Sequence, residues 1–370
     1  MNWGELITLE YGKPVKDKES TDGKVPVYGT NGQIGTSHLP AQCKHPSFIL
    51  GRKGAYRGVH YSDCPFSVID TAFYAEPLTD RIDLKWAYYK FLTYDINGMD
   101  SGSAIPSTDR YQIYSIEVEV PPLEKQRKIV AVLDCIDRKI NINQKVNDNL
   151  QQQAVTLFKS WFVDFSLFGG TVPENWEDTT LENITTLITR GIAPKYSNDS
   201  DQTVINQKCI RNHTIDLSLA RSHTPKAINE KWLQFGDLLI NSTGDGTLGR
   251  VAQVWFAPKA LTVDSHVTIV RPAREELIFY IGLWGILHEK EIESLHTGST
   301  GQTELPRDRV KMLKLLLPDN ISLSRFNSII APMTSTIISN QEENQKLANL
   351  RDTLLPKLMS CEIGVANIQL

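Results

Sequence analysis

The chain has 370 residues, of which 41% are hydrophobic and 22% are charged, a composition typical of a soluble globular protein with room for two or more domains. It contains no apolar run of the roughly 18 residues that a membrane helix needs, so we expect no membrane span. Five scattered cysteines without a CxxC pair argue against a disulfide framework or a zinc site and indicate a reducing, cytoplasmic location.

The net charge of −4 would ordinarily count against nucleic acid as a partner. Net charge, however, does not describe how charge is distributed along the chain. Residues 23–62 contain no Asp or Glu, although the chain has 43 acidic residues, and they carry several lysines, arginines and histidines. Such a local field favours a polyanion as partner. A loop-rich surface that happens to lack acids is the alternative.

Strand and helix patterns alternate in the first third of the chain. "FSVIDTAFYAEP" (66–77) predicts a strand and "DLKWAYYKFLTYDI" (83–96) a helix, while "DRYQIYSIEVEVPP" (109–122) shows a strand-like alternation that ends at two prolines. This mixture predicts an α+β module.

A long amphipathic helix is predicted next, with apolar residues at the 3.5-residue period of a coiled coil. Its seam consists of Ile129, Leu133, Ile136, Ile140, Asn143, Asn147, Leu150, Ala154, Leu157 and Trp161. From first to last position the seam spans about 48 Å at 1.5 Å per residue.

The second half repeats this order. "LLINSTGDGTLGRVAQVWF" (238–256) and "ALTVDSHVTIV" (260–270) predict strands around turns, and residues 276–295 predict a helix. "PRDRVKMLKLLLPD" (306–319) again shows an alternation that ends at a proline. The second module is therefore also predicted to be α+β.

Adding 197 to each seam position gives a second seam with asparagines at the same two places. Its positions are Phe326, Ile330, Met333, Ile337, Asn340, Asn344, Leu347, Arg351, Leu354 and Leu358. Arg110 falls on Arg307 at the same offset, and "SGS" (101–103) matches "TGS" (297–299) with a one-residue slip. Pro356 predicts that this helix ends near Leu355.

Antiparallel pairing of the two helices would bring Asn143 to the level of Asn344 and Asn147 to that of Asn340. Buried amides cost stability but select one register, because a slipped seam leaves them opposite hydrocarbon. The helices would then hold two modules at a fixed distance, which suits a bipartite double-stranded target. The alternative is that each helix packs only on its own domain.

Candidate DNA-binding residues are basic, amide, hydroxyl and aromatic side chains near glycine turns. Glycine lets the backbone approach phosphates, Arg and Lys supply charge or read guanine, and Asn and Gln can pair with adenine. In the first module these are Lys13, Tyr28, Asn31, Arg52, Lys53, Tyr56, Arg57 and Arg110. In the second they are Arg190, Lys195, Tyr196, Asn206, Gln207, Lys208, Arg211, Thr243, Thr247, Arg250 and Arg307.

The chain resembles the specificity subunits of type I restriction-modification systems, most specifically in "VPVYGTNGQIG", "GRKGAYRGVHYSDCPFSVIDTAFY", "PPLEKQRKIVAVLDCIDRKI", "LFKSWFVDF", "VINQKCIRNH" and "LRDTLLPKLMSCEI". Cys361 stands where the family usually has glycine. The resemblance implies two tandem α+β target recognition domains joined by two long helices that pair as an antiparallel coiled coil, in a pseudo-twofold repeat. The implied segments are 1–122, domain 1; 123–168, spacer helix 1; 169–319, domain 2; 320–362, spacer helix 2; and 363–370, a tail.

The resemblance also implies partners: double-stranded DNA, two adenine methyltransferase subunits and, in the full complex, restriction subunits. S-adenosylmethionine, ATP and Mg would then belong to the partner subunits, and this chain would need no cofactor or metal and would carry no catalytic residue.

Missing motifs favour the same non-catalytic interpretation. The sequence has no GxxxxGK[ST] for ATP and no Asn-Pro-Pro or Asp-Pro-Pro of the kind that amino-methyltransferases use. Glu117 and Glu119 are best explained by a solvent-facing strand edge, and Asp264 with His266 lacks an accompanying nucleophile. Two alternatives stay open: an adaptor that binds only proteins through its paired helices, and a nuclease or methyltransferase that acts alone.

Overall fold

The computed structural model describes residues 1–20, 22–99, 106–298 and 303–365. The chain forms two compact units, the first made of residues 1–141 with 344–370 and the second of residues 142–343. Each unit takes in half of each long helix, so the units do not coincide with the segments that the sequence predicts. No helix in the described part of the chain is long and apolar enough to cross a membrane.

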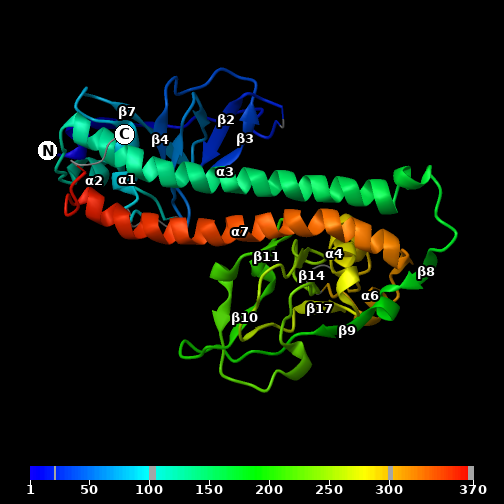
Figure 1. Cartoon of the computed structure of the whole chain (residues 1–370). Coiled ribbons are helices and arrows are strands. Elements are labelled where there is room, and N and C mark those ends of the chain that lie inside the picture. Colours follow the sequence, from blue (N-terminus) through cyan, green and yellow to red (C-terminus); the bar gives the residue numbers. More distant parts are fainter. Residues whose placement is uncertain (21, 100–105, 299–302, 366–370) are drawn as a thin grey trace. The chain divides into compact units, whose positions relative to one another are not determined.

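The first unit is built on two small sheets and short helices (Figure 1). A four-stranded antiparallel sheet has the order β1-β7-β4-β5, and a three-stranded sheet has the order β3-β2-β6 with β2 and β6 parallel. The elements are η1 (Trp3–Glu5), β1 (Ile7–Tyr11), β2 (Val25–Gly29), β3 (Gly32–Ser37), β4 (Ser47–Gly51), β5 (Val59–Ser62), β6 (Ser67–Val68), β7 (Ala72–Pro77), α1 (Leu84–Phe91) and α2 (Arg110–Ser115).

The second unit repeats this arrangement with additional strands. Its main antiparallel sheet has the order β15-β14-β17-β9, and a three-stranded sheet has the order β13-β10-β16 with β10 and β16 parallel. Two-stranded pairs β11-β12 and β18-β8 complete it. The strands are β8 (Glu177–Thr180), β9 (Thr185–Arg190), β10 (Thr203–Ile205), β11 (Ile210–Arg211), β12 (Thr214–Ile215), β13 (Arg221–Ser222), β14 (Leu238–Asn241), β15 (Val251–Gln253), β16 (Leu261–Val263), β17 (Val267–Pro272) and β18 (Lys314–Leu317).

Its shorter helices are η2 (Ser166–Phe168), η3 (Leu181–Ile184), η4 (Gln207–Cys209), η5 (Leu217–Leu219), η6 (Asn229–Lys231), η7 (Glu275–Leu277), α4 (Ile278–Leu287), α5 (Glu289–Ser294) and α6 (Arg307–Lys311). The predicted α+β class is therefore confirmed for both units.

The internal repeat extends to the sheets. Strands β1, β7, β4 and β5 correspond in order to β9, β17, β14 and β15. Gly12 and Gly191 each follow the first strand of the set, where a Cβ would lie 2.1 Å from the Ile69 carbonyl oxygen and 1.9 Å from the Val263 carbonyl oxygen. Only glycine permits this close approach between the two sheets of each unit.

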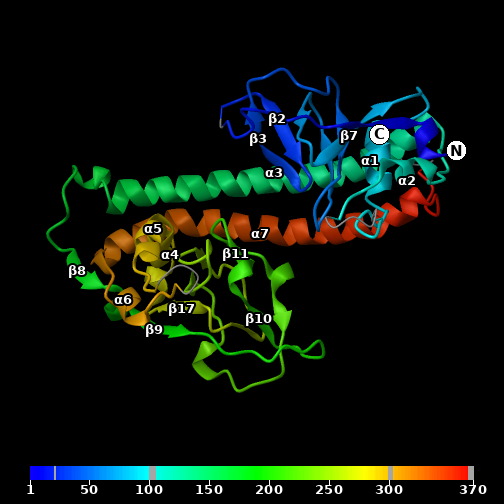
Figure 2. The same cartoon turned by 180° about the vertical axis from the view of Figure 1, so that it is seen from behind.

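The two long helices are α3 (Leu123–Phe162) and α7 (Asn320–Met359), and in both units they lie side by side (Figures 1 and 2). Pro121 and Pro122 precede α3, and Asp319 caps α7 by accepting bonds from the backbone of Ile321 and Ser322. All twenty predicted seam positions are buried or half-buried.

In the first unit the start of α3 packs against the end of α7, and in the second unit the reverse holds, so the helices are antiparallel. Ile129 and Leu133 share the first core with Leu355 and Leu358. Arg351, the charged seam residue, pairs with Asp137 of α3 at 3.0 Å. The second core joins Phe158, Trp161 and Phe162 of α3 to Phe326 of α7, with ring centroids 4.8–6.0 Å from Phe326.

The seam asparagines form hydrogen bonds within each unit. In the second unit Asn340 Nδ2 donates to Asn147 Oδ1 at 2.8 Å, the pair that the sequence predicts, and Asn143 Nδ2 donates to Glu343 Oε2 at 2.8 Å. In the first unit Asn344 Nδ2 donates to the Ile140 carbonyl at 3.4 Å. The pairing of Asn143 with Asn344 would join the two units and stays a prediction.

Some local predictions were wrong. Residues 110–115 form α2 instead of a strand, because Asp109 caps a short helix that Ile113 anchors in the core. The second long helix does not end near Leu355 but continues to Met359, since Leu358 and Met359 are buried in the first core. The glycine-turn match falls on residues 101–103 and 299, which lie outside the described residues.

Candidate nucleic-acid interface

Two arginines meet one tyrosine ring where strands β1 and β4 of the first unit end. The guanidinium carbons of Arg52 and Arg110 lie 4.9 Å and 4.8 Å from the centroid of the Tyr11 ring. Arg52 follows β4, Tyr11 ends β1 and Arg110 begins α2. We call these three residues the first strand-end cluster. Cation–π attraction holds the two like charges close together on one aromatic ring.

Main-chain bonds fix the position of this cluster. The backbone N–H of Arg52 donates to the Thr71 carbonyl at 2.8 Å, and its carbonyl accepts from the Thr108 N–H at 2.8 Å. The guanidinium Nη1 of Arg52 donates to the Asp70 carbonyl at 2.9 Å. Among the described residues, no carboxylate forms an ion pair with Arg52 or Arg110. The cluster is therefore cationic, with two half-buried arginines on an exposed ring, a setting that attracts phosphate.

Arg57 differs from the other predicted contacts because it is only 2% exposed. Its Nη2 donates to the carbonyls of Ile96 and Asn97 at 3.3 Å and 2.7 Å, and its backbone N–H donates to the Asn97 side chain. The structure thus gives Arg57 a role in holding the loop after α1, not a surface position from which it would meet DNA.

The remaining candidates of the first unit occupy varied positions. Lys13, Asn31 and Tyr56 are exposed, and Lys53 is half-buried. Tyr28 is half-buried with its ring against Phe66, and burial raises the pKa of its hydroxyl. Exposed groups can reach a duplex directly, whereas Tyr28 supports the β2 strand.

The corresponding strand end of the second unit is neutralised. Arg190, which ends β9, places its Nη1 2.6 Å from the Glu304 carboxylate and donates from Nη2 to the Leu305 carbonyl at 2.9 Å. Arg307 is exposed at the start of α6. The arginine at this strand end is therefore paired with a carboxylate, unlike Arg52 and Arg110 of the first unit.

An amide and hydroxyl network lies beside this pair. Thr243 Oγ1 contacts Gln207 Oε1 at 3.2 Å and His266 Nδ1 at 2.7 Å, and Asn241 Nδ2 donates to the Gln207 carbonyl at 3.1 Å. Thr247 Oγ1 donates to the Thr243 carbonyl. Such groups can donate to or accept from base edges.

The hydrogen-bond partners of Asn206 and His266 show what these two side chains do in the fold. The Asn206 side chain accepts from the Lys208 N–H and donates to the Leu219 carbonyl, so both ends of its amide are engaged. Asp264 accepts from the backbone of His266 and not from its ring, which excludes a carboxylate–imidazole dyad in this conformation. Burial raises the pKa of the Asp264 carboxyl.

A second stacked pair lies at the edge of the β13 sheet. The Arg221 guanidinium carbon lies 3.5 Å from the centroid of the Tyr196 ring, which is 41% exposed. Lys195, Lys208 and Arg211 are exposed, and Arg250 is half-buried. Arg221 and Tyr11 could not be predicted from local sequence, because each acquires its role from a partner far along the chain.

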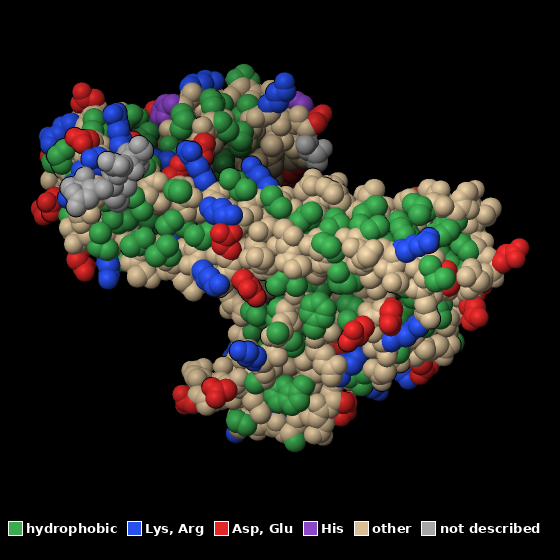
Figure 3. Space-filling model, viewed as in Figure 1, with side chains coloured by type: hydrophobic (Ala, Val, Ile, Leu, Met, Phe, Trp, Pro, Cys, Tyr) green, Lys and Arg blue, Asp and Glu red, His purple; other side chains and the backbone are tan. Residues whose placement is uncertain are grey.

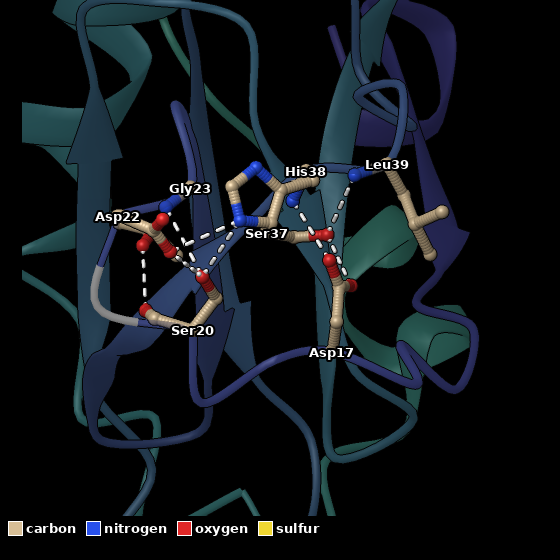
Figure 4. A network of polar contacts seen from close by, with 8 residues as sticks. Asp17, Ser20, Asp22, Gly23, Ser37, His38 and Leu39 are labelled. Atoms are coloured by element: carbon tan, nitrogen blue, oxygen red, sulfur yellow. Dashed lines mark hydrogen bonds and ion pairs between the residues drawn. The ribbon is translucent and has the colours of Figure 1, made fainter.

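The polar residues around the β3 end are drawn in Figure 4, and they resemble a catalytic trio only in composition. Ser20 Oγ and Asp22 Oδ1 both contact the same His38 nitrogen, Nε2, at 3.1 Å and 3.0 Å. A Ser–His–Asp relay needs the two ring nitrogens to face different partners. Asp17 instead accepts from Ser37 and from the His38 N–H, which lowers the pKa of its carboxyl and ties Asp17 to β3.

Cys43, His45 and Glu76 form a metal-ligand type cluster among the described residues, with ligand atoms within 4.8 Å of one another. These groups already have partners. His45 Nε2 lies 2.7 Å from Glu76, and the Cys43 thiol contacts the His45 carbonyl at 3.3 Å. Burial raises the pKa of the Cys43 thiol to about 11, which disfavours the thiolate that binds metals. This geometry does not require a cation.

Charges of both signs are distributed over the surface. On the face shown in Figure 3, Lys and Arg side chains are interspersed with Asp and Glu side chains. An attraction for polyanions must therefore come from local clusters, as the net charge of −4 also indicates.

Comparison with known proteins identifies the framework that carries these clusters. Residues 2–152 match the family model described as the type I restriction modification DNA specificity domain. The match spans the strands of the first unit and most of α3. The predicted resemblance is confirmed.

Similarity to curated relatives extends beyond residue 152. The chain is 25% identical over 319 residues to the type I restriction enzyme MjaIX specificity subunit of Methanocaldococcus jannaschii, covering 78% of this chain and 71% of the relative. It is 21% identical over 354 residues to the type I restriction enzyme HindI specificity subunit of Haemophilus influenzae, covering 75% and 74%.

The fold also matches a solved structure. The type I restriction-modification system S subunit from M. genitalium superposes with a TM-score of 0.59 at 17% identity, covering 97% of this chain and 95% of that one. The fold of that S subunit therefore extends over both units of this chain.

Proposed function

We propose that the chain is the DNA specificity subunit of a type I restriction-modification complex and reads a bipartite double-stranded target. Each unit would read one half-site, and the chain itself would perform no catalysis. The observation that carries this proposal is the repeat itself: both units have the same strand order and each places candidate DNA-binding side chains at the same strand end.

Helices α3 and α7 would set the gap between the two half-sites. Each has 40 residues, or about 60 Å at 1.5 Å per residue, and their seam contains the Asn147–Asn340 pair. A slipped register would break this pair, so the helices favour one length.

The same helices would dock the partner subunits. α3 exposes Ile142 and Val146 to 57% and 41%, and α7 exposes Ile329 and Leu350 to 41% and 48%. Apolar side chains on a solvent-facing helix surface suit a protein interface. Two methyltransferase subunits and the restriction subunits would bind there and would supply S-adenosylmethionine, ATP and Mg.

The first experiment is to coexpress the chain with its neighbouring methyltransferase subunit and to sequence the host DNA for methylated adenine. We expect a split motif with a constant gap. Copurification without any methylation would favour the alternative, an adaptor that binds proteins only. Methylation of a continuous motif would contradict the bipartite interpretation.

A deletion tests the spacer. Removing the facing heptads 142–148 and 339–345 keeps the seam in phase and shortens the helices by about 10 Å, which corresponds to about three base pairs. We expect the methylated motif to keep both half-sites and lose about three base pairs of gap. A full-length control with leucine at Asn149, which is exposed on α3 and lies outside the seam, should keep the original gap length. An unchanged gap in the deletion variant would refute the spacer role.

A further inference from the structure

Corresponding positions at the two strand ends carry different residues. Gly12 N donates to the Ala72 carbonyl and Gly191 N donates to the Val267 carbonyl, so these glycines are equivalent in the repeat. The residues directly before them, Tyr11 and Arg190, therefore occupy the same place. Likewise the Thr108 N–H donates to the carbonyl of Arg52, which follows β4, and the Leu305 N–H donates to the carbonyl of Ser242, which follows β14.

The first unit leaves its positive charge uncompensated. Arg52 and Arg110 share the Tyr11 ring, and in the described part of the chain their guanidinium groups donate to the Asp70 and Leu9 carbonyls and to the Tyr111 hydroxyl. All of these acceptors are neutral. Two guanidinium groups held about one ring, partly shielded from water, create a local positive potential.

The second unit cancels the charge of its strand-end arginine. The side chain of Arg190 is 24% exposed, and its bond to Glu304 is 2.6 Å long. A phosphate would have to displace this carboxylate and take up the same guanidinium edge. The paired arginine therefore has little attraction left for DNA.

We propose that the two units bind the DNA backbone by unequal means, with Arg52 and Arg110 contacting phosphate in the first unit while Glu304 holds Arg190 away from phosphate in the second. This inference rests on the proposed function and assigns a division of labour within it. In the second unit the Gln207–Thr243–His266 network offers amide, hydroxyl and imidazole groups, and Arg190 is already paired with Glu304, so Arg190 adds little to the salt dependence of binding there.

Salt dependence measures these contacts directly, because log K for duplex DNA falls with log salt by about 0.9 per phosphate neutralised. The probe is a fluorescent random-sequence duplex titrated with the full-length chain at several NaCl concentrations. Arg52→Gln and Arg110→Gln should each reduce the slope by about 0.9. Over a fourfold rise in salt, each variant should then lose about three- to fourfold less affinity than the native chain.

Glu304→Gln should increase the slope by about 0.9, because it frees the Arg190 guanidinium, whereas Arg190→Gln should leave the slope unchanged. The matched control is Glu182→Gln, which breaks the comparable surface pair with Lys311 at 2.8 Å and makes the same change in net charge. Arg52→Lys, which keeps the charge, should retain the native slope. Circular dichroism confirms that each variant is folded.

The outcomes separate this inference from the function on which it rests. If the native chain binds duplex DNA without salt dependence, the proposed function fails. If the native chain binds with a steep slope but Arg52→Gln and Arg110→Gln keep that slope, only the unequal division fails. Equal effects of Glu304→Gln and Glu182→Gln would also overturn it, because they would reduce the effect to net charge.

Discussion

Replacing Asn147 with leucine tests whether the seam amides select the register of α3 and α7. In the native chain Asn340 Nδ2 donates to Asn147 Oδ1 at 2.8 Å, and Asn147 Nδ2 donates to the Ile337 carbonyl at 3.4 Å. The substitution leaves the Asn340 amide opposite hydrocarbon. An unpaired buried donor costs about 1–3 kcal/mol, and since both asparagines are half-buried we expect a loss near 1 kcal/mol.

The double variant Asn147→Leu with Asn340→Leu should behave differently. It replaces both partners with apolar groups, which is close to neutral or stabilising for a seam. The two single losses therefore should not add, and the coupling free energy should be about 1 kcal/mol or more. Register, in contrast, should become less specific, because a leucine seam fits several alignments.

Urea unfolding followed by far-UV circular dichroism gives the four free energies of the cycle. Asn149→Leu is the matched control, since Asn149 is exposed on the same helix and its change should stay within about 0.5 kcal/mol. Additive losses in the double variant, or a single variant as stable as the native chain, would show that the pair does not couple the helices.

Two further predictions concern the second unit. Phe326→Ala should lower the free energy of unfolding by about 3–5 kcal/mol, because Phe326 is fully buried against Phe158, Trp161 and Phe162. Ile329→Ala, at an exposed position of the same helix, should change this free energy little. Urea titration compares the two variants. Burial would raise the pKa of Asp319, but bonds from Ser322, Trp176 and Ile321 outweigh it and lower the pKa from 3.8 to about 2. The ionised carboxylate therefore stabilises the fold above about pH 4, and this contribution is lost as the pH falls toward 2. Between these pH values the melting temperature of the native protein should fall more steeply than that of Asp319→Asn. Parallel curves of melting temperature against pH would refute the assignment.

The features that the sequence predicts well depend on long periodic patterns. The seam continues over ten positions in each helix, so one misleading residue changes little, and the 197-residue offset checks the pattern against itself. Strand 238–241 was equally accessible, because its apolar run Leu238–Ile240 lies between Gly236 and Gly244. Arg351 broke the apolar pattern, and its bond to Asp137 explains why the seam tolerates it.

Short elements and paired side chains were harder to predict. α2 has six residues, and the Asp109 cap with buried Ile113 decided its conformation against an alternating pattern. Arg57 looks like any basic residue between glycines until the Ile96 and Asn97 carbonyls are brought beside it. Tyr11 and Arg221 matter only because folding stacks them against side chains from other strands or helices. Such pairings arise from tertiary structure, which local sequence does not contain.

Comparison of the two repeats shows which positions the backbone contacts constrain and which positions can change residue. The bonds of Gly12 to Ala72 and of Gly191 to Val267 use main-chain atoms, and a side chain at either glycine would collide with a carbonyl. These positions are therefore fixed by the approach of the two sheets. The residue directly before each glycine contributes no side chain to that approach, so Tyr11 and Arg190 could diverge without disturbing the framework. A duplicated fold with fixed backbone contacts and variable strand-end side chains can acquire a different chemistry in each unit. Here the first unit carries the Arg52–Tyr11–Arg110 cluster, and the second carries the Arg190–Glu304 pair.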